Sequence, residues 1–134
     1  MENVKIVVRF GDGRVIKGST QDFSPNKPLF HLHPYDTNIS KEGIEVFVKD
    51  LKAIFFVRDF EGNAQYKERK QFLEGERPSG RMVQIIFNDG EVLVGTTLGY
   101  DPKRPGFFLF PPDSQGNNIR VFAVSKAIRK VQYP

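Results

Sequence analysis

The chain contains one segment twice, and this internal repeat constrains the fold more than any other feature of the sequence. The segment from Phe10 to Pro34 recurs without a gap from Phe87 to Pro111. The identical pairs are Phe10/Phe87, Asp12/Asp89, Gly13/Gly90, Val15/Val92, Gly18/Gly95, Thr20/Thr97, Pro25/Pro102, Pro28/Pro105, Phe30/Phe107, Leu32/Leu109, Pro34/Pro111 and, just beyond, Asp36/Asp113. Most of them are hydrophobic or turn-forming residues. The repeat therefore predicts two similar small lobes.

Each lobe is predicted to be a five-stranded all-β unit. Asp12-Gly13 and Asp89-Gly90 supply the positive φ of a tight hairpin between the first two strands. Strands are expected at 4–10, 14–20, 29–33, 44–48 and 52–57, and again at 82–87, 91–97, 106–110, 119–124 and 126–132. Because units this small bury little apolar surface alone, the lobes are expected to pack on each other or on a second copy.

The domain organisation expected from this pattern has three parts. Residues 1–58 form a first small β-barrel, residues 59–80 a charged linker, and residues 81–134 a second small β-barrel. Residues 64–73 of the linker favour a short helix, which is either solvated or docks the lobes. The fold class predicted is all-β, with two tandem five-stranded barrels joined by a partly helical linker.

Composition excludes several classes of protein. The chain has no Cys, so it has no disulfide, no thiolate nucleophile and few options for zinc. It lacks an apolar run of roughly eighteen residues and a leader-like start, so we expect a soluble cytoplasmic protein that has no membrane partner. The formal net charge of +4 permits contact with polyanions but does not identify one.

The sequence contains no recognisable catalytic constellation. It has no nucleophile elbow and no phosphate-binding Gly-Lys-Ser/Thr loop, so we expect neither enzymatic activity nor a cofactor. His31 and His33 lie on one face of an expected strand, with Asp36 nearby in sequence. They are weak candidates for a metal, and because the second lobe has no counterpart we predict no metal site.

The second lobe carries aromatic residues where the first carries these histidines. Phe108 and Phe110 stand at the positions of His31 and His33. An aromatic pair on a face that is polar in its twin indicates a covered surface. The alternatives are a lobe interface, a dimer contact, or a stacking platform for a base or ring.

The closing strands of the two lobes differ in the opposite sense. Residues 53–57 are apolar on both faces, which predicts a strand buried on both sides. Aligned on their shared Ala-Ile, residues 127–131 place Arg129 and Lys130 at the positions of Phe55 and Phe56. The residues expected at the interface, between lobes or with a protein partner or second copy, are Phe55, Phe56, Phe108 and Phe110.

Cations interleaved with aromatic residues are what binding of a single-stranded nucleic acid requires, because cations meet phosphates and rings meet bases. Outward strand positions are also charged for solubility, so the pattern allows both interpretations. The cations of this basic rim are Arg9, Arg14, Lys17, Lys27, Lys49, Lys52, Lys103, Arg104, Arg120, Lys126, Arg129 and Lys130.

Two stretches resemble the signatures of Sm-like proteins. Residues 8–18, followed by Asp22-Phe23 and Asn26, resemble the first signature, and residues 48–57 resemble the second. The resemblance implies small five-stranded Sm-like or SH3-like barrels that bind RNA. Under it, phosphates are contacted by Lys27, Lys103 and Arg104.

The chain departs from the Sm-like pattern at the base-contacting positions. In the base-binding loop it has Ser24-Pro25-Asn26 and Asp101-Pro102-Lys103. Where the pattern has Arg-Gly, it has Lys49-Asp50 and, in the second lobe, Val124-Ser125.

A second resemblance is to PilZ domains, which bind cyclic di-GMP. Residues 77–81 have the Arg-x-x-x-Arg spacing that precedes the first strand of those domains. Residues 101–106 resemble their second motif, with Lys103 in place of Ser. The resemblance implies that Arg77 and Arg81 hold a cyclic dinucleotide while Asp101 and Gly106 shape the pocket.

The chain as a whole also resembles a bacterial domain family of unknown function. It shares Asp-Gly-Arg at 12–14, Asp-Phe-x-Pro at 22–25 and the segment 51–62. The function expected is a non-enzymatic binding or regulatory module, such as a protein-interaction or adaptor module. The alternatives are a PilZ-like cyclic di-GMP receptor and an Sm-like binder of RNA or single strands.

Overall fold

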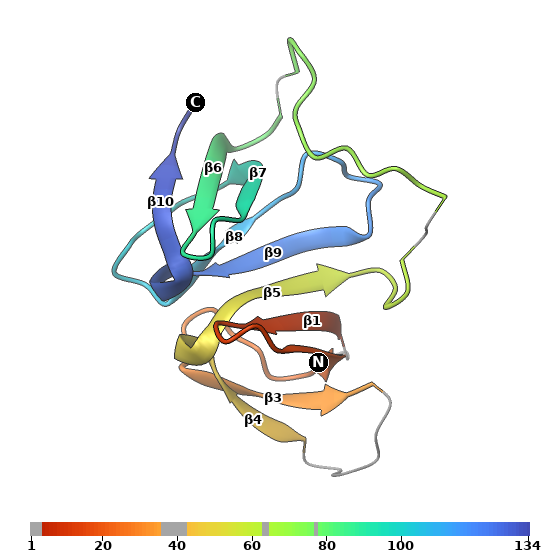
Figure 1. Cartoon of the computed structure of the whole chain (residues 1–134), viewed down its shortest axis with the longest axis vertical. Coiled ribbons are helices and arrows are strands. Elements are labelled where there is room, and N and C mark those ends of the chain that lie inside the picture. Colours follow the sequence, from red (N-terminus) through yellow and green to blue (C-terminus); the bar gives the residue numbers. More distant parts are fainter. Residues whose placement is uncertain (1–3, 36–42, 63–64, 77) are drawn as a thin grey trace.

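The fold is all-β, as the sequence predicts. The structure is a computed structural model that describes residues 4–35, 43–62, 65–76 and 78–134 (Figure 1). The strands are β1 (Val4–Phe10), β2 (Val15–Thr20), β3 (Leu29–Pro34), β4 (Ile44–Phe47), β5 (Leu51–Val57), β6 (Arg81–Phe87), β7 (Val92–Thr97), β8 (Gly106–Leu109), β9 (Asn118–Val124) and β10 (Ile128–Gln132). Two single 3-10 turns, η1 (Val48–Asp50) and η2 (Ser125–Ala127), precede β5 and β10.

The strands form one large and one small sheet. A seven-stranded sheet has the order β4-β3-β2-β1-β5-β9-β8, and a three-stranded sheet has the order β10-β6-β7. An isolated bridge between Thr96 and Phe110 connects the end of β7 to the segment after β8. The prediction of two tandem five-stranded barrels is not confirmed, because β5 of the first half (β1–β5) pairs with β9 of the second half (β6–β10).

The two predicted hairpins are present and have the same construction. Gly13 has φ 98° and Gly90 has φ 93°, a region that side chains disfavour. The Asp before each glycine accepts a hydrogen bond from the backbone N–H two residues on, at 3.0 Å for Asp12 and 2.9 Å for Asp89. Local turn chemistry therefore defines both hairpins.

The strand pairing of the first half recurs in the second half between residues shifted along the chain by the interval from Phe10 to Phe87. Leu51 pairs with Phe10 across a bulge in the first half. Ile128 pairs with Phe87 across the corresponding bulge in the second half. The same offset relates the pairing of β3 with β4 to that of β8 with β9.

This offset corrects the alignment of the closing strands. Phe55 pairs with Val7, and the equivalent pair in the second half is Gln132 with Gln84. The equivalents of Phe55 and Phe56 are thus Gln132 and Tyr133, and the sequence-based assignment of Arg129 and Lys130 to those positions is wrong. The shared Ala-Ile dipeptide was misleading because Ala127 lies in η2 and not in the strand.

The two halves share their cores across the paired strands β5 and β9. All seven residues of β5 are buried, which confirms the prediction of a strand covered on both faces. Ile54 and Phe56 pack in the core of the first half, whereas Phe55 packs in the core of the second half. In return, Phe122 and Val124 of β9 pack in the core of the first half. Each half therefore completes the core of the other.

Lys52 ties β5 to the hairpin of the second half. Its residue is 9% exposed, and its Nζ donates to Asp89 at 2.7 Å and to the carboxylate of Glu91. Burial alone would lower the pKa of Lys52, but its hydrogen bonds to Asp89 and Glu91 raise that pKa above its ordinary value. The ammonium group is therefore charged and holds the two halves together.

The linker packs on the second half without forming a helix. No helix occurs in its described residues 65–76, so the predicted short helix is not found there. Two of its polar groups donate hydrogen bonds to the carboxylate of Asp113 in the second half. The Tyr66 hydroxyl donates at 2.7 Å and the Arg69 N–H at 3.0 Å. The Arg69 guanidinium in turn pairs with Glu76 at 2.9 Å.

Changing Asp113 to Asn should loosen the linker. Hydrogen bonds from the Arg69 N–H and the Tyr66 hydroxyl hold the pKa of Asp113 below its ordinary value of 3.8. Because that pKa is depressed, its contribution to stability is complete above pH 3.8 and is lost as the pH falls through the folded value. We expect a lower protection factor for the Arg69 amide, meaning faster exchange relative to the intrinsic rate at the same pH, in Asp113→Asn at neutral pH, and in the wild type only below pH 3.8.

Amide exchange followed by NMR measures this effect. The control is Asp101→Asn. Asp101 accepts a hydrogen bond from the Lys103 N–H, as Asp113 does from the Gln115 N–H, but it makes no hydrogen bond to the linker. Unchanged exchange at Arg69 in Asp113→Asn would show that Asp113 does not anchor the linker.

Candidate functional site

A cationic hollow lies where the loops of residues 24–28 and 101–105 meet, which are called the Pro-bracketed loops because each contains two prolines. Its volume is about 330 Å³. Its lining residues are Pro28, Val48 and Lys49 of the first half, and Pro102, Lys103, Arg104, Pro105, Val124, Ser125 and Lys126 of the second. Four of these carry positive charge, and no carboxylate lines the hollow within the described parts of the chain.

Backbone hydrogen bonds hold the elements of this hollow in place. The N–H of Val48 donates to the Pro28 carbonyl at 2.9 Å, and that of Ser125 donates to the Pro105 carbonyl at 2.9 Å. Each 3-10 turn is thus fixed to the Pro-bracketed loop of its own half. The Ser125 hydroxyl also donates to the Arg104 carbonyl at 2.8 Å. The cations therefore extend from stiff backbone, since the prolines restrict φ.

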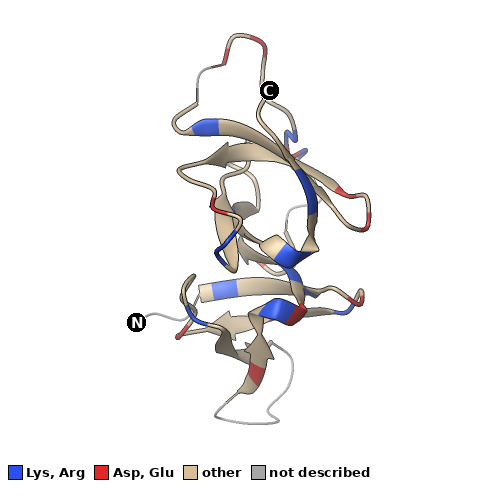
Figure 2. Ribbon diagram, turned by 90° about the vertical axis from the view of Figure 1, so that its left-hand side faces the viewer, with Lys and Arg blue, Asp and Glu red and all other residues tan. Residues whose placement is uncertain are grey.

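The cations occupy equivalent positions in the two halves. At the offset established by strand pairing, Lys49 corresponds to Lys126, and Lys27 corresponds to Arg104. Figure 2 shows segments bearing Lys and Arg on both sides of the boundary between the halves. Aligning Lys49-Asp50 with Val124-Ser125 concealed this equivalence, so sequence reasoning left Lys49 and Lys126 in the general basic rim.

The charge of the hollow is not neutralised by ion pairs. Among the described residues, the carboxylates that form salt bridges use Arg14, His31, Lys52 and Arg69. None of the cations that line the hollow takes part in these pairs. Two carboxylates, Asp50 and Asp89, line a neighbouring hollow beside Lys49 and Lys126, and Asp89 is paired with Lys52. The face therefore keeps a net positive charge.

An aromatic hollow of about 490 Å³ adjoins the cationic hollow, because Arg104 lines both. Its lining residues are Pro25, Thr97, Leu98, Gly99, Tyr100, Asp101, Arg104, Gly106, Phe107, Phe108, Phe110 and Phe122. Leu98 is 84% exposed and Phe110 is 36% exposed, so an apolar rim faces solvent. Asp101, Arg104 and Gly106 of the sequence-predicted site come together here.

The four aromatic residues expected at an interface lie in different environments. Phe55 and Phe56 belong to the two shared cores, and Phe108 packs on Phe56 with ring centroids 5.9 Å apart. The guanidinium of Arg120 covers Phe108 at 4.3 Å. Phe110 is exposed at the rim of the aromatic hollow, which Phe108 also lines.

Among the described residues of the predicted cyclic dinucleotide site, Asp101 and Gly106 line the aromatic hollow, whereas Arg81 and Lys103 do not. Arg81 stacks its guanidinium on Tyr133 at 3.7 Å and lines neither hollow. Arg77 lies outside the described residues. Lys103 lines the cationic hollow and not the aromatic one. Lys27 is exposed on the first Pro-bracketed loop, where its N–H donates to the Ser24 carbonyl at 3.1 Å.

His31 of β3 interacts with a carboxylate. The Nδ1 atom of His31 lies 2.6 Å from Asp22, which also accepts the His31 backbone N–H at 2.9 Å. Burial opposes ionisation of Asp22, but these hydrogen bonds lower its pKa. Within the described residues no three potential ligands gather to hold a metal ion, and Asp36 lies outside those residues.

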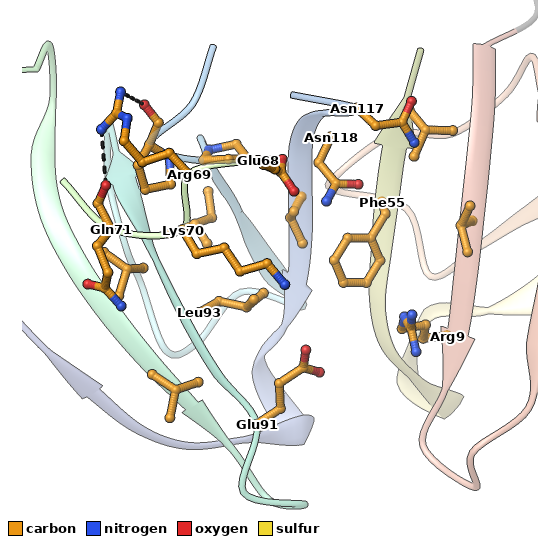
Figure 3. A pocket seen from close by; sticks show the side chains of 18 of the residues that line it. Arg9, Phe55, Glu68, Arg69, Lys70, Gln71, Glu91, Leu93, Asn117 and Asn118 are labelled. Carbon is orange, nitrogen blue, oxygen red and sulfur yellow. Dashed lines mark hydrogen bonds between the residues drawn. The ribbon is translucent and has the colours of Figure 1, made fainter. Parts of the chain in front are cut away.

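A groove of about 480 Å³ between the halves and the linker carries mixed charge (Figure 3). The Phe55 ring faces this groove, with Arg9 on one side and Lys70 extending from the linker. Glu68 and Glu91 also line it. The groove cannot be predicted from local sequence, because three segments distant in sequence form it. Its cations are Arg9, Lys17, Arg69 and Lys70, so it differs from the cationic hollow in having carboxylates among them.

Within the described residues, no helix is long and apolar enough to span a membrane.

Comparison with known proteins identifies the family of the chain. Searches of curated proteins and of solved structures each gave no match, so the resemblances to Sm-like, SH3-like and PilZ domains are not confirmed. The model of a family of unknown function, DUF6982, matches residues 2–133, and the chain therefore belongs to that family.

Proposed function

We propose that this protein is a non-enzymatic module that binds single-stranded nucleic acid on the face formed by its two Pro-bracketed loops. The observation that carries the proposal is the convergence of the equivalent cations Lys49 and Lys126, with Lys103 and Arg104, around one hollow that no described carboxylate lines. A phosphate chain passing over this hollow can contact cations from both halves.

The size of the electrostatic effect follows from the number of cations. Each phosphate contact with a single strand makes the slope of log K against log salt more negative by about 0.7. Contacts with all four cations of the hollow would thus give a slope of about −3. An interaction of this kind is strong at low salt and falls steeply at physiological salt.

The neighbouring aromatic hollow favours a single strand over a duplex. Bases that are unstacked can lie on exposed rings beside the cations that hold their phosphates. Reading a duplex instead requires an element that enters a groove. The loops around the cationic hollow are short turns held by prolines, and they provide no such element.

A protein partner is the second candidate function, in keeping with the expected interaction or adaptor role. The supporting observation is the apolar rim formed by Leu98 and Phe110. Exposed apolar residues beside a hollow are typical of interaction sites. If this rim binds a second copy, sedimentation of the wild type will show concentration-dependent association, and Leu98→Ser will abolish it.

Replacing both Lys49 and Lys126 by Ala should weaken binding of a short fluorescent single-stranded RNA. Loss of two phosphate contacts predicts roughly tenfold to thirtyfold weaker affinity at 0.1 M salt and a salt slope shallower by about 1.4. Fluorescence anisotropy across a salt series measures both. Arg129→Ala with Lys130→Ala is the matched control, because it removes the same charge from exposed positions that do not line the hollow.

Two outcomes would contradict the proposal. One is equal weakening in the two double variants, which would show that only net charge matters. The other is no binding of the RNA by the wild type at low salt. Cyclic di-GMP is titrated in parallel, and saturable binding that Arg81→Ala removes would identify a cyclic dinucleotide receptor instead.

A further inference from the structure

We infer that the aromatic hollow is a subsite for one unstacked nucleobase, an inference that rests on the proposed function. Arg104 lines both the cationic and the aromatic hollow. A phosphate held at Arg104 therefore places its own base, or the adjacent one, within reach of the rings. The hollow's volume of about 490 Å³ falls in the range of roughly 300–1,000 Å³ that small-molecule sites occupy.

The rings that line this hollow differ in how far they are open to a ligand. Phe122 and Phe107 are buried and form its floor. Phe110 is exposed at the rim, and Tyr100 is half-buried with its ring 4.9 Å from that of Phe107. Phe108 also lines the hollow and is half-buried, but the Arg120 guanidinium covers its ring at 4.3 Å. Phe110 and Tyr100 therefore offer the ring surface on which a base can stack.

Polar groups at this hollow are mostly engaged within the protein. The Thr97 hydroxyl donates to the Gly99 carbonyl at 3.1 Å and accepts the Gly99 N–H at 3.2 Å. One oxygen of Asp101 accepts the Lys103 N–H at 2.9 Å. Recognition by stacking, with few polar contacts to a base edge, predicts a site that tolerates different bases.

Within its described residues the first half has no equivalent subsite, because its own side chains fill or change the corresponding surface. Phe23, at the position of Tyr100, packs against the rings of Phe30 and Phe122 at 5.4 Å and 5.1 Å. His33 stands at the position of Phe110. The repeat therefore provides cations from both halves, whereas the rings of the base subsite come from the second half.

The test compares a single strand with an abasic strand of equal length and charge. We expect the wild type to bind the base-bearing strand about 5-fold to 100-fold more tightly, because stacking of one base contributes on that scale. Phe110→Ala should remove most of this difference and leave the abasic strand bound as before. Tyr133→Ala is the control, since Tyr133 is similarly exposed, at 39%, and stacks on Arg81 outside the hollow.

A second variant and a spectroscopic signal keep the test decisive if Phe110→Ala folds poorly. Phe110→Leu keeps an apolar side chain but removes the ring. A strand carrying one 2-aminopurine between normal bases should gain fluorescence on binding to the wild type, because the bound base leaves its stacked neighbours, and this gain should be smaller with Phe110→Leu. Absence of a gain with the wild type would overturn the inference.

The outcomes separate this inference from the proposed function. Equal affinity for both strands, with weakening by the Lys49 and Lys126 variant, would overturn the base subsite and leave phosphate binding in place. Failure of the wild type to bind either strand would overturn the proposed function itself.

Discussion

Replacing Phe122 by Ala will lower the free energy of unfolding by about 3–5 kcal/mol, the usual effect of removing a buried aromatic ring. Phe122 is fully buried in the core of the first half although it belongs to the second. Its ring packs on Phe23 at 5.1 Å and on Phe108 at 5.2 Å. A loss of this size is a large part of the roughly 5–15 kcal/mol that stabilises a typical domain.

The same variant tests whether the halves fold as one unit. Because this ring belongs to a strand of the second half but lies in the core of the first, we expect a single cooperative transition in the wild type and one destabilised transition in Phe122→Ala. Urea denaturation followed by circular dichroism and by tyrosine fluorescence measures it. Ile119→Ala on the same strand is the control, since Ile119 is 47% exposed. Two separate transitions, with only one moved by Phe122→Ala, would show independent halves.

The hairpins and most strands could be predicted because their signals are local. Asp-Gly turns at 12–13 and 89–90 and the alternating apolar residues of each strand depend on neighbours in the chain. The pairing of β5 with β9 could not be predicted in this way. The apolar segment 53–57 indicated burial on both faces, but no local pattern specifies which distant strand covers it.

The linker shows how tertiary contacts override local preference. Residues 64–73 favour a helix by composition, yet the N–H of Arg69 donates to Asp113 and that of Leu73 donates to Glu76. These side-chain acceptors replace the carbonyls that a helix would offer. Asp113 lies too far along the sequence for a local prediction to include it.

The candidate site was only partly visible in the sequence. Lys103 and Arg104 were selected because they lie between two prolines, and they do line the cationic hollow. Lys49 and Lys126 were not selected, because their equivalence depends on the register of β5 and β10. Lys49 and Lys126 are separated by the same number of residues as Phe10 and Phe87. Extending the repeat at this constant spacing beyond Pro111 would therefore have paired the two lysines.

Replacing Gly106 by Ala will destabilise the protein and disturb the aromatic hollow. A Cβ at this position would lie 2.4 Å from the Ala123 carbonyl oxygen and 2.6 Å from the Phe122 ring. The carbonyl belongs to the strand that pairs with β8, so neither group can move away freely. We expect a cost of at least about 1–3 kcal/mol, the usual range for overpacking. Thermal denaturation followed by circular dichroism measures it.

Gly99→Ala is the matched control, because no atom lies within 4 Å of a Cβ at that position and its backbone is not in the left-handed region. Removing a flexible glycine there should leave stability unchanged or raise it slightly. The pair therefore separates close packing from the general effect of adding a methyl group near the hollow. Equal stability of the two variants would mean that Gly106 is not needed for the approach of β8 to Phe122. In that case the floor of the aromatic hollow would be adaptable, and the predicted difference between base-bearing and abasic strands should shrink.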